Sequence, residues 1–257
     1  DWLVLSQACG QQLADPQVAA IVITHGTDTL EETAWFLQCV LPAGKPVVLT
    51  CAMRPASALS ADGPANLRDA LACAADGGAL AWAQAGQPVL VVAAGEVHSA
   101  AAVRKAHAYQ VHAFSSAPAG PVAWVEEGRL RWAQRLPQQV VVKNAVPLPP
   151  LPWPWVEVVT SHAGARAEGV DALVAAGVRG LVVAGTGNGT VHAAWLPALQ
   201  RARAAGVPIV RTTRCAEGRI VQAPGQDDAE VVDLPPLKAR ISFMLRCMSP
   251  SVPGLSS

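Results

Sequence analysis

The chain has 257 residues, carries no net charge because 19 basic side chains balance 19 acidic ones, and is 51% hydrophobic with only 15% charged residues. Neutral charge without a basic run argues against nucleic acid or an anionic membrane surface as a partner, and no apolar run is long enough to span a membrane. The apolar composition suits a parallel sheet covered on both faces, or an oligomer with large buried interfaces.

Strand and helix patterns alternate through the first part of the chain. We expect helices over residues 1–13, 29–40 and 64–75, strands over 18–24, 46–50 and 88–93, and a loop over 51–63. Gly77 and Gly78 are expected to end the third of these helices. This alternation predicts βαβ units and a parallel sheet. A small hairpin is expected over residues 124–130, around Gly128.

A proline-rich stretch then divides the chain. Residues 146–154 contain five prolines, which favour an extended connector. We therefore predict an N-terminal α/β domain over 1–145, a linker over 146–155 and a smaller C-terminal α/β domain over 156–257. Beyond the linker we expect strands over 156–160, 180–184 and 207–210, and helices over 169–176, 190–205 and 236–248. The predicted fold class is α/β, with two mainly parallel sheets flanked by helices and a larger, Rossmann-like N-terminal domain.

The most informative segment follows the first predicted strand. A β-branched run ends at His25, the dipeptide Thr27-Asp28 comes next, and a helix then begins. Thr29 and Glu32 fit a capping box, so Thr27 and Asp28 are not needed to cap the helix. They lie at the end of a strand, where α/β sheets bind ligands. The alternative is that these two residues only cap the helix. The helix is expected to bury four apolar side chains, Leu30, Ala34, Leu37 and Leu41.

A hydroxyl such as that of Thr27 needs an adjacent base to become a nucleophile. A lysine that loses its proton through desolvation is suitable. Of the four lysines, Lys105 follows the strand predicted over 88–93 and lies among small apolar residues. The alternative is a lysine on the protein surface.

Several segments together resemble the bacterial-type L-asparaginases (asparaginase/glutaminase family). They are ITHGTDTLEETAWFL at 23–37, AMRP at 52–55, SADGPANL at 60–67, GTGNG at 185–189 and KARI at 238–241. The resemblance implies hydrolysis of the side-chain amide of L-asparagine, and of L-glutamine as a second substrate, without a metal or organic cofactor. It also implies a homo-oligomer, dimer or tetramer, with active sites between subunits. We expect a cytoplasmic protein.

The resemblance also implies roles for single residues. Thr27 would act on the substrate or on a water, Lys105 would accept the proton, and Asp28 would hold Lys105 and the substrate α-amino group. Lys105 precedes VHAF, at 111–114, at the spacing of the family. Gly26 and Ala52 would contribute to substrate binding, and Arg54 would brace the Ala52 loop. The alternative for Arg54, which we favour, is a structural salt bridge with Asp62 or Asp69.

Other family features are absent from the sequence. The family begins with a Thr-Gly-Gly-Thr-Ile loop, whose threonine attacks the amide, followed by a lid tyrosine and a substrate-binding serine. The only tyrosine here, Tyr109, is elsewhere. We expect these elements upstream of Asp1. The alternatives are a catalytically silent relative that binds an amino acid, or the amidase subunit of a tRNA-dependent amidotransferase. Three residues are candidates for an acid that reaches a neighbouring subunit: Asp227, Asp228 and Glu230.

The remaining polar motifs favour structural roles. His25 is expected to be a hydrogen-bonded structural residue, and the other histidines lack metal-ligand spacing. Residues 185–189 lack the lysine of a phosphate loop and predict a tight turn between strand and helix. The six scattered cysteines are expected to be buried, apolar and reduced.

Overall fold

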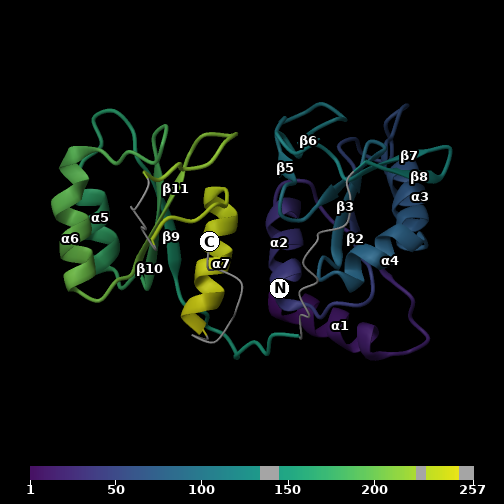
Figure 1. Ribbon diagram of the computed structural model, residues 1–257, viewed down its shortest axis with the longest axis horizontal. Helices are drawn as coiled ribbons and strands as arrows, with labels where there is room; N and C mark the ends of the chain where they lie inside the picture. The colour runs from purple at the N-terminus through teal and green to yellow at the C-terminus, as the bar shows by residue number, and fades with distance from the viewer. Residues whose placement is uncertain (134–144, 224–229, 249–257) are drawn as a thin grey trace. The chain divides into compact units, whose positions relative to one another are not determined.

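The computed structural model describes residues 1–133, 145–223 and 230–248, and it divides into two compact units, Asp1–Pro147 and Leu148–Ser257. Figure 1 colours both units by position along the chain. The division lies within the proline-rich stretch, where residues 145–155 form neither helix nor strand. Among the described residues, no helix combines the length and apolar character needed to cross a membrane.

Unit 1 is an α/β layer structure around a six-stranded sheet. Its strands lie in the order β1-β2-β3-β4-β7-β8. β1, β2 and β3 run parallel, and β4, β7 and β8 continue the sheet as antiparallel strands. The elements are α1 (Trp2–Ala14), β1 (Ile21–Thr24), α2 (Leu30–Val40), β2 (Val47–Thr50), α3 (Gly63–Ala74), α4 (Gly77–Gln84), β3 (Val89–Ala93), β4 (Glu96–Ser99), β5 (Arg104–Lys105), β6 (Phe114–Ser115), β7 (Ala123–Glu126) and β8 (Arg129–Trp132).

The central strands of unit 1 lie between helices. Every residue of β2 and β3 is buried. Alternate side chains of a strand point to opposite faces, and Val48 and Leu90 pack with α3 and α4 in one apolar cluster. α2 lies on the other side of the sheet (Figure 1). This two-sided cover explains why the sequence of β2 and β3 reads as an unbroken apolar run.

The sequence predicted most of unit 1 correctly, and two details were wrong. The buried face of α2 is confirmed, since Leu30, Ala34, Leu37 and Leu41 are all buried. Thr29 is the N-cap of α2, but its side chain makes no capping hydrogen bond, so the predicted capping box does not form. The second error concerns residues 77–78, which begin α4 rather than end α3. The cause is local, because Asp76 accepts a hydrogen bond from the Gly78 amide and caps the new helix.

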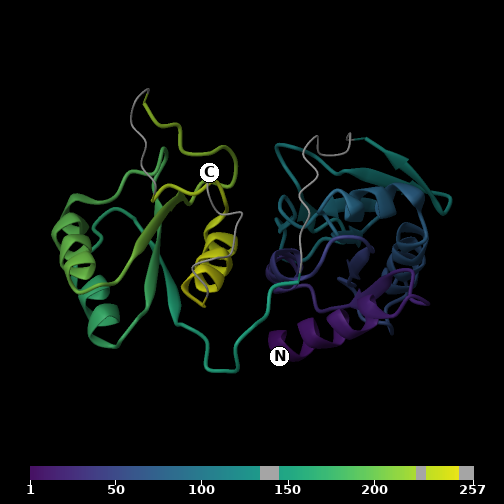
Figure 2. The ribbon, with the colours of Figure 1, turned by 60° about the horizontal axis from the view of Figure 1, so that its bottom comes forward.

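Unit 2 is a smaller α/β layer structure. Its three strands are parallel in the order β11-β10-β9, and its elements are β9 (Val156–Thr160), α5 (Glu168–Ala175), β10 (Gly180–Gly185), the 3-10 helix η1 (Ala193–Trp195), α6 (Leu196–Ala204), β11 (Ile209–Thr213) and α7 (Pro236–Met248). α5 and α6 cover one face of this sheet and α7 covers the other (Figures 1 and 2). The two-domain α/β fold class is thereby confirmed, with an antiparallel extension to the sheet of unit 1.

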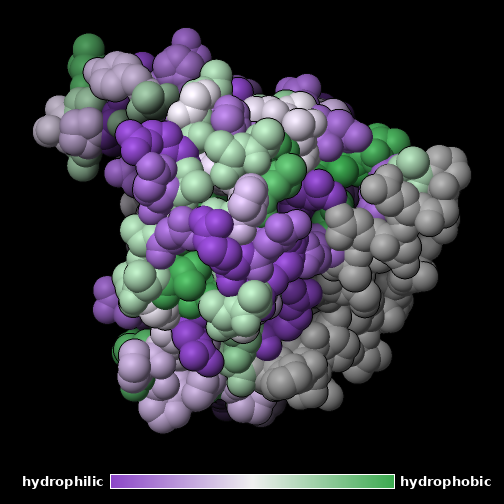
Figure 3. Space-filling model, turned by 90° about the vertical axis from the view of Figure 1, so that its left-hand side faces the viewer, coloured by the Kyte–Doolittle hydropathy of each residue, from purple (hydrophilic) through white to green (hydrophobic). Residues whose placement is uncertain are grey.

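The outer surface of α5 and α6 is mainly polar with small apolar patches between (Figure 3). Exposed ion pairs lie on these helices, such as Arg201 with Asp171. The inner surface packs a core that includes Val170, Leu181 and Leu199. The predicted helix over 190–205 begins later, because His192 accepts a hydrogen bond from the Ala194 amide and caps η1. The last strand also lies later than predicted, at Ile209–Thr213.

All six cysteines are free thiols. Cys9, Cys51 and Cys73 are buried, and Cys39 and Cys247 are half-buried. Cys215 is exposed, so the expectation of burial is wrong for this residue. It lies two residues beyond Thr213, the last residue of β11.

Candidate functional site

The carboxyl ends of β1 and β2 lie side by side and carry the candidate loops. Thr24 pairs in register with Thr50, and the His25 amide donates to the Thr50 carbonyl oxygen at 2.9 Å. Thr27 and Asp28 therefore lie in the loop from β1 to α2, and Ala52 follows the neighbouring strand end. Parallel α/β sheets bind ligands at this edge.

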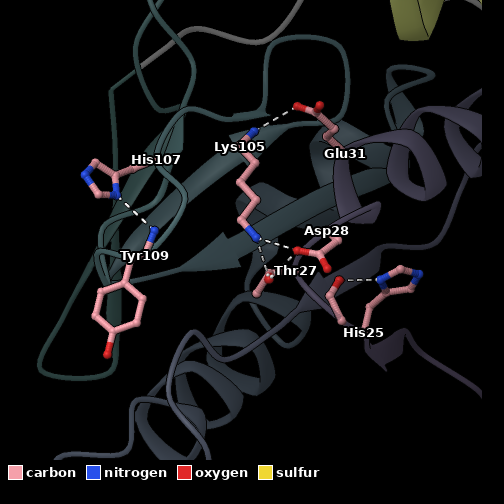
Figure 4. A network of polar contacts seen from close by, with 8 residues as sticks. His25, Thr27, Asp28, Glu31, Lys105, His107 and Tyr109 are labelled. Carbon is pink, nitrogen blue, oxygen red and sulfur yellow. Dashed lines mark hydrogen bonds and ion pairs between the residues drawn. The ribbon is translucent and has the colours of Figure 1, made fainter.

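Lys105 reaches the same edge from a distant part of the chain. Its Nζ lies 2.9 Å from Thr27 Oγ1 and 2.7 Å from Asp28 Oδ1 (Figure 4). Thr27 Oγ1 is also 3.5 Å from the same carboxylate oxygen. The Lys105 side chain is 17% exposed and that of Asp28 is 92% exposed. The structure thus brings together the hydroxyl, the carboxylate and the amine that the sequence singled out.

The ion pair changes the titration of Asp28. The hydrogen bond from Lys105, and then its positive charge, lower the pKa of the Asp28 carboxyl below its ordinary value of 3.8. Asp28 is therefore ionised at neutral pH. The exposed carboxylate lies beside a hydroxyl and has room to accept a second cationic partner.

The Ala52 loop is held by buried polar groups at the start of α3. Asp62 accepts hydrogen bonds from the backbone amides of Met53 and Arg54, each at 2.9 Å. Asn66 donates to the Cys51 carbonyl oxygen at 2.9 Å and to Asp62 at 3.1 Å. Ala52 itself is exposed. These contacts fix the loop that leaves β2 while they leave the residue at its front accessible.

Arg54 braces this loop, but not by the predicted ion pair. Its guanidinium donates to the carbonyl and hydroxyl oxygens of Ser60. Asp62 is engaged by backbone amides, and Asp69 pairs with Arg68. The predicted salt bridge of Arg54 with Asp62 or Asp69 is therefore wrong, because local backbone donors use the acid that the sequence offered.

Cys51 lies behind the site. Burial and the negative charge of Asp62 raise the pKa of its thiol to about 12, and the charge of Lys105 acts in the opposite direction. That opposing influence reflects the closeness of Lys105 to the end of β2. Cys51 is accordingly a protonated, apolar wall residue rather than a nucleophile.

The histidines have structural contacts. His25 Nδ1 lies 2.6 Å from the Gly26 carbonyl oxygen, and its Nε2 lies 3.1 Å from Thr33 Oγ1. His98 is buried, with its Nδ1 2.8 Å from Ser116 Oγ. Within the residues that the structure describes, no three histidine, cysteine or acidic side chains gather in an arrangement that holds a metal.

Tyr109 and the three acidic candidates lie apart from this group or outside the described residues. Tyr109 is exposed on the loop between β5 and β6, where its backbone amide donates to His107 (Figure 4). Asp227 and Asp228 lie outside the described residues, and Glu230 pairs with Arg203 on the surface of unit 2.

The glycine-rich segment 185–189 forms the predicted tight turn. Thr186 and Thr190 bond to each other through their backbones at 2.8 Å. Gly187 and Gly189 have positive φ, and a side chain at Gly185 would lie 2.5 Å from the Gly189 backbone. Asn188 closes the turn against Val221, through bonds to both its amide and its carbonyl.

Comparison with known families agrees with this geometry. Residues 1–138 match the family model "Asparaginase, N-terminal", and residues 155–249 match "Glutaminase/Asparaginase C-terminal domain". The chain belongs to the asparaginase family. The N-terminal match covers the β1–α2 loop and Lys105, and the C-terminal match covers nearly all of unit 2.

Individual relatives of this asparaginase-family chain span more residues than it does. A glutaminase-asparaginase of Pseudomonas fluorescens biotype A is 39% identical over 248 residues, which are 91% of this chain and 65% of the relative. A probable periplasmic L-asparaginase of Haemophilus influenzae is 36% identical, over 95% of this chain and 70% of the relative. The fold also matches the crystal structure of a probable cytoplasmic L-asparaginase from Campylobacter jejuni, with a TM-score of 0.84 and 32% sequence identity. The match covers 96% of this chain and 79% of that one.

The sequence did not single out every residue that contacts the site. Glu31 accepts a hydrogen bond from the Lys105 amide, and Asn66 links the ends of β2 and β3. Neither a single glutamate nor a single asparagine in a predicted helix indicates a role at a site. Both residues lie within the family-like segments at 23–37 and 60–67, and the resemblance implied no role for either.

Proposed function

We propose that the protein is an amidohydrolase that hydrolyses the side-chain amide of L-asparagine to L-aspartate and ammonia, with L-glutamine as a second substrate. The observation that carries this proposal is the contact of Lys105 Nζ with Thr27 Oγ1 and Asp28 Oδ1, at 2.9 and 2.7 Å. Family membership and the names of the relatives support the choice of substrate.

In the proposed reaction a threonine hydroxyl is the nucleophile, and Thr27 acts on the substrate or on the attacking water. The hydroxyl attacks the amide carbon of the substrate, and Lys105 accepts the hydroxyl proton. The carbon–nitrogen bond then breaks, the proton passes from Lys105 to the leaving nitrogen, and ammonia departs. Water attacks the resulting ester and releases aspartate, which restores the hydroxyl. Backbone amides at the strand ends stabilise the negative charge on the oxygen in each addition step.

Asp28 has two proposed tasks. Its carboxylate orients Lys105, and its exposed side receives the α-ammonium group of the substrate. The lowered pKa of Asp28 supports both tasks, since the group stays anionic wherever the substrate amine is cationic. Gly26 lies exposed beside Thr27 and leaves room for the backbone of the substrate. The exposed Ala52 loop would receive the side-chain amide.

The assembly and the compartment also belong to this proposal. We propose a homo-oligomer, dimer or tetramer, with small-molecule amino-acid substrates, and a cytoplasmic location. The apolar composition supports an assembly with buried interfaces. Size-exclusion chromatography with light scattering tests the assembly, and a monomer with full activity would contradict sites shared between subunits.

The function is tested by ammonia release from L-asparagine and L-glutamine. We expect activity in the wild-type protein and its loss by about a hundredfold or more in Thr27→Val and in Lys105→Met. Val keeps the shape of Thr without the hydroxyl, and Met keeps the length of Lys without the amine. Lys45→Met is the control, because Lys45 bonds only to the carbonyls of Leu13 and Asp15. Full activity in both site variants would overturn the assigned roles. Binding of asparagine without ammonia release by the wild type would instead favour a catalytically silent relative.

A further inference from the structure

The strand pairing that holds the backbone of Lys105 is short. It belongs to β5, a two-residue strand that pairs with the two-residue β6 in a sheet separate from the main one. A short two-stranded ribbon is marginally stable. The ladder of the main sheet therefore does not set the position of the Lys105 backbone.

A side chain from the first turn of α2 also holds the Lys105 backbone. The backbone amide of Lys105 donates to Glu31 Oε2 at 2.8 Å, across 74 positions in the sequence. Glu31 lies in the first turn of α2, directly after the loop that carries Thr27 and Asp28. A hydrogen bond to a carboxylate is stronger than one between neutral groups.

One segment thus holds Lys105 at both ends. Thr27 and Asp28 contact the amine, and Glu31 binds the backbone amide of the same residue (Figure 4). The Lys105 side chain is extended between these two contacts (Figure 4). Holding the amide on α2 therefore sets where the amine lies relative to the Thr27 hydroxyl.

We propose that Glu31 is a positioning residue that places the amine of Lys105 on Thr27 by binding the Lys105 backbone amide. The inference rests on the proposed function, because it assigns Glu31 a part in the same reaction. Glu31 itself acts through Lys105. Small displacements of a catalytic group cost large factors in rate.

Two substitutions separate the hydrogen bond from the charge. Glu31→Gln keeps an oxygen acceptor for the Lys105 amide and removes the charge, whereas Glu31→Ala removes both. Glu32→Ala is the matched control, since Glu32 is the other acidic residue in the first turn of α2 and contributes the same kind of helix-end charge. Urea unfolding of each variant verifies that the chain is folded.

The first readout is hydrogen exchange at the amide of residue 105, which requires no activity. We expect protection in the wild type, in Glu31→Gln and in Glu32→Ala, and a loss of about tenfold or more in Glu31→Ala. Unchanged protection in Glu31→Ala would overturn the inference.

The second readout is the kinetics of ammonia release from L-asparagine. We expect kcat to fall about tenfold to a hundredfold in Glu31→Ala with little change in KM, and Glu31→Gln to recover most of the loss. A kcat for Glu31→Ala equal to that of Glu32→Ala would overturn the positioning role. A different outcome is that the wild type releases no ammonia while hydrogen exchange at residue 105 still depends on Glu31. That outcome would overturn the proposed function, and with it the catalytic role of the bond between Glu31 and the Lys105 amide.

Discussion

Lys105 and Asp28 form an ion pair, with 2.7 Å between Nζ and Oδ1, although 77 positions separate them in the sequence. The pair exists because β1 and the β5–β6 ribbon bring their ends to one edge of unit 1. Thr27 joins it through a bond to the same amine. The arrangement supplies a hydroxyl, an amine and a carboxylate within contact of one another, and it supports the proposed amide hydrolysis.

Removing Lys105 should change how Asp28 titrates. In the wild type the hydrogen bond from Lys105 and its charge lower the Asp28 pKa below 3.8, so the pair stabilises the folded state at neutral pH. That contribution is lost as the pH falls through the lowered pKa of Asp28. We expect Lys105→Met to raise the Asp28 pKa toward its ordinary value in an NMR titration of carboxyl carbons. Lys45→Met should leave it unchanged, and an equal pKa in Lys105→Met would refute the pair in solution.

Asn66 should contribute strongly to the stability of unit 1. Its buried amide donates to the Cys51 carbonyl and to Asp62, and its oxygen accepts from the Ala94 amide. Asn66→Ala should lower the free energy of unfolding by about 2–4 kcal/mol, because it leaves buried backbone groups without a partner. Asn188→Ala is the comparison in urea unfolding. Asn188 also makes two backbone bonds but is exposed, so its loss should cost about 1 kcal/mol or less.

Ser116 and His112 both contact polar groups of β4, and the stability cost of replacing each should depend on its burial. Ser116 is buried and bonds to the buried His98 at 2.8 Å. Ser116→Ala should destabilise the protein by about 1–2 kcal/mol. His112 pairs with Glu96, but the His112 side chain is 62% exposed. His112→Ala should therefore change the free energy of unfolding by less than about 1 kcal/mol. An equal loss of unfolding free energy in Ser116→Ala and His112→Ala would refute the prediction that burial sets the cost.

The cysteines should differ in reactivity. Burial raises the pKa of both Cys51 and Cys73 to about 12, and Asp62 and Asp76 respectively add to the shift. Alkylation requires the thiolate. After brief treatment with iodoacetamide at mildly alkaline pH, peptide mass spectrometry should find Cys215 modified and Cys51 and Cys73 intact. Rapid labelling of Cys51 would show that the end of β2 opens in solution.

The sequence by itself determined the local elements of this protein. The spacing of Leu30, Ala34 and Leu37 defined the buried face of α2, because a helix repeats every 3.6 residues. The apolar runs of β2 and β3 predicted buried parallel strands. The family resemblance, together with the position of Thr27 and Asp28 after a strand, identified Thr27, Asp28 and Lys105 as candidate site residues.

Only the tertiary structure decided which distant groups meet. The contact of Lys105 with Thr27, the bond from its amide to Glu31, and the use of Asp62 by backbone amides instead of Arg54 all depend on strand order and loop packing. Local periodicity carries no information about these pairs, since hydrogen bonds act over about 3 Å in space regardless of separation along the chain.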